Sequence, residues 1–97
     1  MIRHVALFRW KPEATDEQKE RVPAALATLP STVPSIRAFT AGADAGINQG
    51  NFDFAVTADF DDEPGYLAYR DDPGHRQIWT DVIAPVVAER ASVQLQF

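Results

Sequence analysis

Residues 52–60, with the sequence FDFAVTADF, restrict the fold more than any other stretch of the chain. Side chains alternate along it, so that one face carries Phe52, Phe54, Val56, Ala58 and Phe60. Aspartate, alanine and threonine occupy the other face. A period of two with aromatic rings on one side predicts a β-strand with one buried face. Because such a face must be covered, we expect a sheet with a layer of helices packed against that side.

The other segments supply three more strands and two helical regions. Residues 2–10 alternate in the same way, residues 35–42 form a weaker strand, and residues 91–97 close the chain with another alternating run. Thr15 and Gln18 form a capping-box pattern that begins an amphipathic helix of about four turns, with Pro23 inside it. A second helical region follows residue 60 and is broken before Pro73. The order β-α-β-β-α-β predicts an α+β, ferredoxin-like fold with a four-stranded antiparallel sheet.

The first and third strands are expected to be antiparallel neighbours at the centre of the sheet. The expected register opposes Arg3 to Asp59, Arg9 to Asp53, Val5 to Thr57 and Leu7 to Ala55. Val5, Leu7, Ala55 and Thr57 then form a shallow apolar strip on the face away from the helices. Pairs of opposite charge bound the strip at both ends. Since exposed apolar surface forfeits about 25 cal/mol per Å² of burial, the strip predicts a homodimer packed sheet to sheet. A half-polar, solvated sheet face is the alternative interpretation.

Composition argues against several classes of function. Nine basic residues against fourteen acidic ones give a net charge of −5, without a basic cluster that would attract nucleic acid or an anionic membrane. The chain has no cysteine, two histidines and no glycine-rich phosphate loop, so we expect neither a metal site nor a cofactor. No apolar run approaches the roughly 20 residues that a bilayer needs, and no signal peptide is recognisable. We expect one cytoplasmic domain, residues 1–97, whose partners are small molecules or protein.

The stretch AYRDDPGHRQ, residues 68–77, contains the strongest candidates for chemistry. Asp72 as N-cap and Pro73 in the first turn place His75 near a helix N-terminus, which favours the neutral imidazole that a general base requires. Tyr69 precedes the break and can donate a phenol hydrogen bond, and His4 on the first strand can reach the same cavity. We expect the cavity to be lined by Phe8, Val22, Phe54, Val56, Trp79 and Val86.

The same residues also have a purely structural interpretation. A histidine three residues after an aspartate N-cap can return a hydrogen bond to the cap, and Tyr69 can lie on an amphipathic helix with its hydroxyl in water. The aromatic residues Phe8, Phe54 and Trp79 can all be core residues. The pattern by itself leaves both interpretations open.

The chain resembles the stress-responsive dimeric α/β-barrel (Dabb) domain family over essentially its whole length. The resemblance runs through RHVALFRWK, TDEQKE, FDFAVTADF and YRDDPGH, and its most specific elements are His4 and the spacing of Tyr69, Pro73 and His75. It implies a ferredoxin-like fold and a dimer in which two sheets face each other as an α+β barrel. Some members have no assigned reaction. A plant member, an olivetolic acid-type polyketide cyclase, performs aldol chemistry with a tyrosine and a histidine in the spacing of Tyr69 and His75.

His4 matches the first-strand histidine of that cyclase, but two other positions differ. Phe54 stands where the cyclase has another pocket histidine, and Asp72 stands where many relatives have a histidine before the proline. Three functional hypotheses follow. The first is a stress-response-type dimer that binds a small apolar or phenolic molecule without turnover. The second is a cofactor-free, polyketide cyclase-like enzyme with His75 as general base and Tyr69 as hydrogen-bond donor. The third, from fold analogy alone, is a cofactor-independent monooxygenase.

Overall fold

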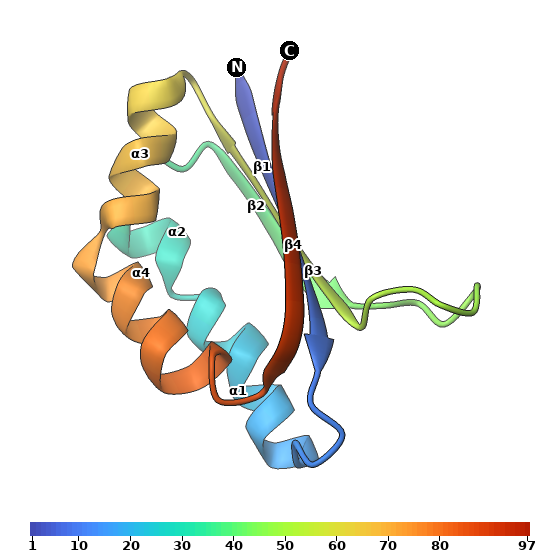
Figure 1. Cartoon of the computed structure of the whole chain (residues 1–97). Helices are drawn as coiled ribbons and strands as arrows, with labels where there is room; N and C mark the ends of the chain where they lie inside the picture. The colour runs from blue at the N-terminus through green and yellow to red at the C-terminus, as the bar shows by residue number, and fades with distance from the viewer.

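An antiparallel sheet forms one layer of the protein, and helices on one of its faces form the other (Figure 1). The computed structural model describes residues 1–97. The strands are β1 (Ile2–Trp10), β2 (Ala38–Ala43), β3 (Phe54–Phe60) and β4 (Val87–Gln96). The helices are α1 (Asp16–Leu26), α2 (Leu29–Thr32), α3 (Glu63–Asp71), α4 (Pro73–Ile78) and a π-helical turn, η1 (Trp79–Ile83). The strand order β2-β3-β1-β4 confirms the predicted ferredoxin-like arrangement.

The expected register of β1 against β3 is confirmed in three of its four pairs: Arg3 with Asp59, Val5 with Thr57 and Leu7 with Ala55. Arg3 donates two hydrogen bonds, of 2.7 and 2.9 Å, to the Asp59 carboxylate.

The expected pairing of Arg9 with Asp53 is wrong, because the ladder ends one residue earlier, at Phe8 and Phe54. Beyond that point the Asp53 carboxylate accepts the backbone N–H of Trp10 at 2.8 Å. The Arg9 guanidinium lies instead over the Phe52 ring, 4.2 Å from its centroid.

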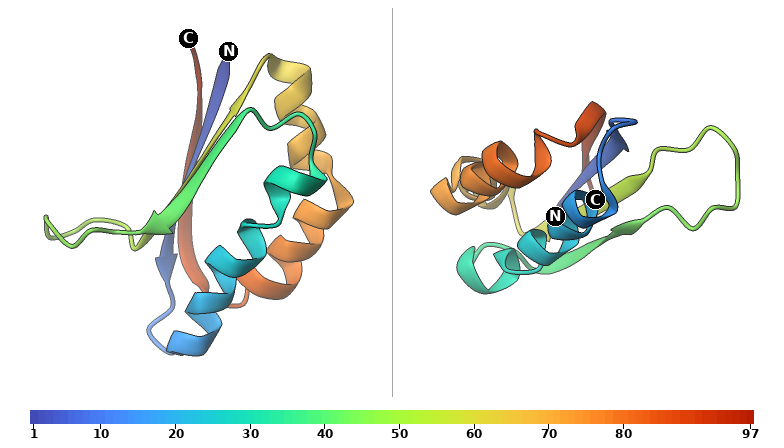
Figure 2. Two further views of the ribbon diagram at one scale, coloured as in Figure 1. Left: turned by 180° about the vertical axis from the view of Figure 1, so that it is seen from behind. Right: turned by 90° about the horizontal axis from the view of Figure 1, so that it is seen from below.

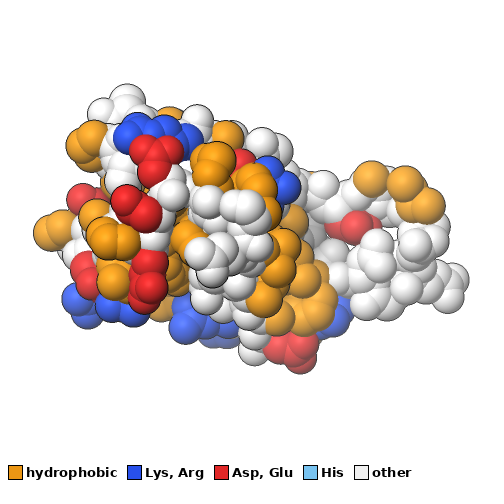
Figure 3. All heavy atoms as spheres, turned by 90° about the horizontal axis from the view of Figure 1, so that it is seen from above, with side chains coloured by type: hydrophobic (Ala, Val, Ile, Leu, Met, Phe, Trp, Pro, Cys, Tyr) orange, Lys and Arg blue, Asp and Glu red, His pale blue; other side chains and the backbone are white.

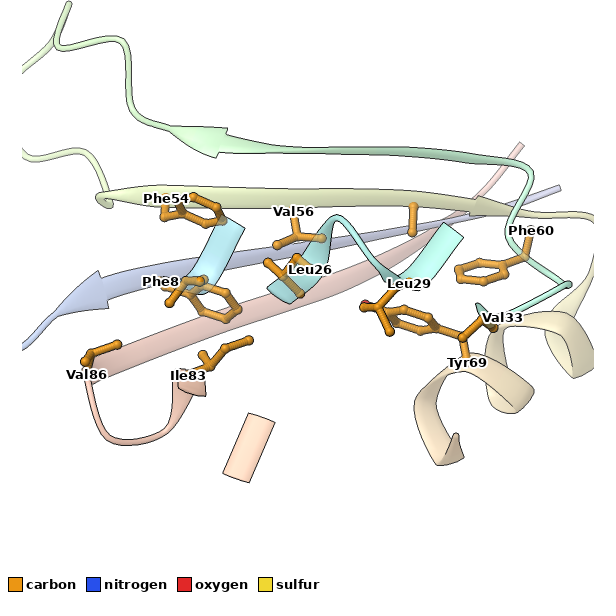
Figure 4. Packing of buried hydrophobic residues seen from close by; sticks show 12 residues of the cluster. Phe8, Leu26, Leu29, Val33, Phe54, Val56, Phe60, Tyr69, Ile83 and Val86 are labelled. Atoms are coloured by element: carbon orange, nitrogen blue, oxygen red, sulfur yellow. The ribbon is translucent and has the colours of Figure 1, made fainter. Parts of the chain in front are cut away.

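The hydrophobic core lies between the helices and the inner face of the sheet, as the alternation from Phe54 to Phe60 predicts. Phe52, expected on the same buried face, lies before β3 and is only half-buried, with the Arg9 guanidinium over its ring. Phe54, Val56, Ala58 and Phe60 are all buried. Opposite them, the helix layer contributes Val22 and Leu26 from α1, Leu29 from α2, Tyr69 from α3 and Ile83 from η1. Figure 4 shows the side chains of both layers meeting in this space.

The first helical region begins as predicted but is divided. Thr15 and Gln18 form both hydrogen bonds of the capping box, of 2.9 and 3.1 Å, and Pro23 lies inside α1. The prediction of a single helix of about four turns is wrong, because α1 ends at Leu26 and α2 starts at Leu29. Pro30 has no N–H to donate to the carbonyl of Leu26, which explains the interruption.

The second helical region is broken where the sequence predicts it. The Asp62 carboxylate accepts the Gly65 N–H at 2.9 Å and caps α3, and the Asp72 carboxylate accepts the His75 N–H at 2.9 Å and caps α4. The sequence did not predict the π-helical turn η1, in which the Ala84 N–H reaches back five residues to the Trp79 carbonyl at 2.8 Å.

The face of the sheet opposite the helices, here called the open face, is uncovered (Figures 1 and 2). β4 is longer than the expected 91–97 strand, and its Val93 and Leu95, level with Val5 and Arg3, are 50% and 49% exposed. Residues 44–53 project from the sheet on the side of the open face (Figure 2). Figure 3 shows hydrophobic side chains on this segment, standing clear of the body, and Ile47 within it is 83% exposed. No helix combines the length and apolar character that crossing a membrane requires.

Candidate functional site

A cavity of about 200 Å³ lies between the helix layer and the strands β1 and β4. Its walls combine residues of both layers: His4, Ala6 and Phe8 of β1, Val56 of β3, Leu26 of α1, Tyr66, Tyr69 and Arg70 of α3, His75 of α4, Trp79 and Ile83 of η1, and Arg90, Ala91 and Ser92 of β4. An apolar cavity of about 150 Å³ accommodates benzene. The cavity therefore has room for a small substituted ring.

The break between α3 and α4 brings Tyr69 and His75 together. Tyr69 lies in the last turn of α3, and His75 in the first turn of α4, while Asp72 between them has an extended ψ of 127° that turns the chain. The two ring centroids are 4.2 Å apart, with planes inclined by 33°. A continuous helix would place residues six positions apart on different faces, so the break creates this pair.

His75 is arranged as a neutral base. Its Nδ1 lies 3.4 Å from the carbonyl oxygen of Arg70, which can only accept, so a proton on Nδ1 suits this contact and leaves the lone pair on Nε2. Burial lowers the pKa of His75 below its usual 6.5, although the Arg70 carbonyl and the Asp72 charge oppose the shift. The imidazole is therefore mostly neutral at neutral pH.

His4 approaches the same cavity from β1 with the opposite hydrogen-bond arrangement. The Gln94 amide nitrogen lies 2.9 Å from its Nδ1, so that Nδ1 accepts and Nε2 carries the proton. Burial, and then the charges of His75 and Arg90, lower the pKa of His4 to about 4. Its ring centroid lies 5.9 Å from that of Tyr69 and 5.1 Å from that of Tyr66.

The Tyr69 side chain is buried, and it points from α3 toward the sheet (Figure 4). Burial and the nearby Tyr66 raise the pKa of its phenol to about 12, so the hydroxyl stays protonated at neutral pH. The Tyr69 hydroxyl makes no hydrogen bond within the chain. Every fully buried side-chain oxygen or nitrogen of the protein has a hydrogen-bond partner, so this hydroxyl oxygen is not fully buried. The hydroxyl therefore retains access to the cavity, where it can donate to a ligand.

The expected cavity residues divide into two groups. His4, Tyr69, His75, Phe8, Val56 and Trp79 border the cavity. Val22, Phe54 and Val86 do not border it, because they pack inside the hydrophobic core.

Four polar residues that border the cavity were not predicted from the sequence: Tyr66, Arg70, Arg90 and Ser92. Tyr66 could have been predicted, because it lies three residues before Tyr69 and residues at this spacing share one face of a helix. Arg90 and Ser92 alternate with Val93, but the expected strand began only at residue 91 and left Arg90 outside it.

The site offers acid–base groups rather than metal ligands. No group of three histidine, cysteine, aspartate or glutamate side chains comes together in a way that could hold a metal ion. A hydrogen-bond acceptor on His75 and donors on Tyr69 and His4 instead meet in a cavity with many apolar walls. Such a set can remove a proton from a bound molecule and stabilise negative charge that develops on an oxygen.

Solved structures with the same fold include several dimeric proteins. A dimeric ferredoxin-like protein of unknown function from Thermobifida fusca is 47% identical, with a TM-score of 0.91 over 99% of this chain and 90% of that one. A dimeric protein of unknown function from Bacteroides fragilis is 25% identical, with a TM-score of 0.83 over 99% and 95%. Hydroxynitrile lyase from Passiflora edulis is 17% identical, with a TM-score of 0.83 over 97% and 90%, and shows the fold alone.

Sequence comparisons identify the family. No curated protein matches the chain. The family model described as the stress responsive A/B barrel domain, Dabb, matches residues 2–97, which include every residue of both layers and of the cavity. The chain therefore belongs to the stress-responsive A/B barrel (Dabb) domain family.

Proposed function

We propose that the cavity binds a small, largely apolar carbonyl compound and that His75, Tyr69 and His4 transfer protons on it without a cofactor. The observation that carries this proposal is the contact between the Tyr69 and His75 rings, whose centroids are 4.2 Å apart, at a cavity large enough for a small ring. Because the pKa of Tyr69 is raised and those of both histidines are lowered, a protonated phenol and neutral imidazoles coexist at neutral pH.

In the proposed step, Nε2 of His75 removes a proton from the carbon next to the ligand carbonyl group. The electron pair of the broken C–H bond forms the C=C bond of an enolate, and the carbonyl π electrons move to oxygen. The Tyr69 hydroxyl and the Nε2–H of His4 donate hydrogen bonds toward that oxygen. The His75 imidazolium then returns its proton to the product, so no net charge is left on the protein.

This step is the first half of an aldol closure, as the polyketide cyclase-like hypothesis requires. The enolate carbon would attack a second carbonyl carbon of the same ligand and form a C–C bond. The name of the Passiflora edulis neighbour supports the idea that this fold can house catalysis. The cofactor-independent monooxygenase hypothesis rests on fold analogy alone and stays a prediction.

We also propose that the protein is a homodimer packed through the open face. Val5, Leu7, Ala55 and Thr57 lie at the centre of this face, and the exposed Val93 extends it. The dimeric relatives from Thermobifida fusca and Bacteroides fragilis support this assembly. Residues 44–53 project on the same side and would flank a second copy seated there.

Exchange of α-protons tests proton transfer without knowledge of the natural substrate. We expect the protein to accelerate deuterium uptake by 4-phenylbutan-2-one in D₂O, measured by proton NMR. His75→Gln should lower the protein-catalysed rate by about 100-fold, and Tyr69→Phe by at least about tenfold, since each removes one catalytic group. Melting temperatures should stay near that of the parent.

Arg76→Gln is the matched control, because Arg76 adjoins His75 but is exposed and does not border the cavity. This variant should exchange protons at the parent rate. An exchange rate for the parent no faster than that of buffer would favour binding without turnover, and an unchanged rate in His75→Gln would exclude the assigned base.

A further inference from the structure

Arg90 occupies the β4 wall of the cavity. It lies directly opposite Phe8 in the β1–β4 ladder, so its side chain is on the helix side of the sheet. Its guanidinium carbon is 4.6 Å from the centroid of the Trp79 ring, and both residues border the cavity. Stacking on an aromatic ring holds a guanidinium in place without consuming its N–H donors.

The charge of Arg90 is unpaired, unlike that of the other arginine in the cavity wall. Arg70 donates two hydrogen bonds, of 2.9 and 3.1 Å, to the carboxylate of Asp71. The Arg90 guanidinium forms no ion pair and no hydrogen bond with any residue of the chain. A guanidinium that is positioned at a cavity and has free donors is suited to bind a carboxylate through two parallel hydrogen bonds.

A second polar group lies beside it on the same strand. Ser92 is two residues from Arg90 on the same face of β4, opposite Ala6, and also borders the cavity. The facing wall, in contrast, contains the rings of Trp79 and Tyr69 and the side chain of Ile83. One wall therefore suits an anionic group, and the other suits an apolar body.

We propose that Arg90, assisted by Ser92, recognises the carboxylate of a small carboxylic acid whose apolar body lies against Trp79. This inference rests on the proposed function, and it narrows the carbonyl compound to a keto acid with an aromatic or aliphatic body. The carboxylate lies at β4, and the carbonyl group is directed to the donors and the base that α3, α4 and β1 provide. Arg90 is a specificity-determining residue in this arrangement.

Binding of a matched pair of probes tests the inference. 3-Phenylpropanoate and 3-phenylpropanamide have nearly the same shape, and only the first carries a charge. We expect the protein to bind the acid about tenfold more tightly than the amide, measured by titration with NMR detection, because a charged hydrogen-bonded pair is lost with the amide. Raising the salt concentration should weaken binding of the acid and leave binding of the amide unchanged.

Two variants assign the preference to Arg90. Arg90→Gln should abolish the preference for the acid while the amide still binds. Arg21→Gln makes the same change of charge on the exposed side of α1, away from the cavity, and should keep the preference. Arg90→Lys should keep about a third of the preference for the acid over the amide, since lysine retains the charge without the planar pair of donors.

Equal affinities for acid and amide in the parent, binding of neither, or an unchanged preference in Arg90→Gln would each overturn the inference. The assay contains no reaction. A protein that prefers the acid but fails to exchange α-protons would therefore retain this inference as ligand recognition and lose only the proposed catalysis.

Discussion

His4 and His75 are both kept neutral by burial at one cavity, but their hydrogen-bond partners differ. The Arg70 carbonyl favours a proton on Nδ1 of His75, and the Gln94 amide nitrogen favours a lone pair on Nδ1 of His4. The Nε2 atoms of the two rings consequently have opposite roles, acceptor on His75 and donor on His4. Since a charge on His75 also lowers the pKa of His4, the cavity disfavours two protonated imidazoles at once.

These pKa shifts predict the pH dependence of the proposed reaction. The protein-catalysed exchange rate should rise as His75 loses its proton, with a midpoint below the usual 6.5 of histidine. Because the Tyr69 phenol has a pKa of about 12, the rate should then stay level through the region near pH 10 where an ordinary tyrosine ionises. NMR exchange rates corrected for buffer give the profile. A midpoint above 6.5, or a fall in rate near pH 10, would contradict these roles.

At the residue level, the sequence pointed to Tyr69, His75 and His4 and to three of their apolar neighbours in the cavity wall, but not to the polar residues Tyr66, Arg70, Arg90 and Ser92. The short separation of Tyr69 from His75 and the alternation of residues 2–10 were enough to predict that these three side chains share one cavity. Arg90 was missed because the run of residues before 91 lacks a clear alternation of apolar side chains. Its inclusion in β4 follows from pairing with β1, which is a long-range contact that local sequence patterns do not encode.

Among the elements, the junction of α3 and α4 has the greatest effect on the site. The Asp72 carboxylate caps α4 through the backbone N–H of His75 itself. Asp72→Ala should therefore lower the free energy of unfolding by about 1 kcal/mol, as expected for loss of an N-cap, and should also lower the exchange rate because His75 is less firmly placed. Chemical denaturation and the NMR exchange assay measure the two effects.

Asp71→Ala provides the control, since it removes the adjacent carboxylate, which is exposed and paired only with Arg70. Surface pairs of this kind contribute little, so its stability should match that of the parent. Equal losses in the two variants would mean that charge, rather than the cap, explains the effect.

The strands and caps could be predicted, whereas two features of the helices could not. Alternation predicted the buried face of β3, and the Asp72-Pro73 pair predicted the start of α4. The interruption between α1 and α2 was missed, although Pro30 provides its physical cause. The π-helical turn that begins at Trp79 was not predicted from any local pattern.

For the whole molecule, the open face predicts the oligomeric state. Val5 lies level with both Thr57 and Val93 at the middle of this face. Val5→Lys should convert a dimer into a monomer at micromolar concentration, because burying an unpaired ammonium between two sheets is strongly unfavourable. Sedimentation velocity measures the mass. Ala24→Lys, on an exposed position of α1, adds the same charge and should leave the dimer intact. A monomeric parent, or a dimer that tolerates Val5→Lys, would exclude this interface.

The stacking of Arg90 on Trp79 has an optical consequence. Trp79 borders the cavity and Trp10 does not, so only one of the two indoles would change its surroundings when a ligand enters. The emission of an indole depends on nearby charge and water, and a carboxylate bound by the Arg90 guanidinium beside the ring alters both. A Trp10→Phe variant would therefore report occupancy of the cavity by intrinsic fluorescence, and libraries of unlabelled acids could be screened directly on the protein.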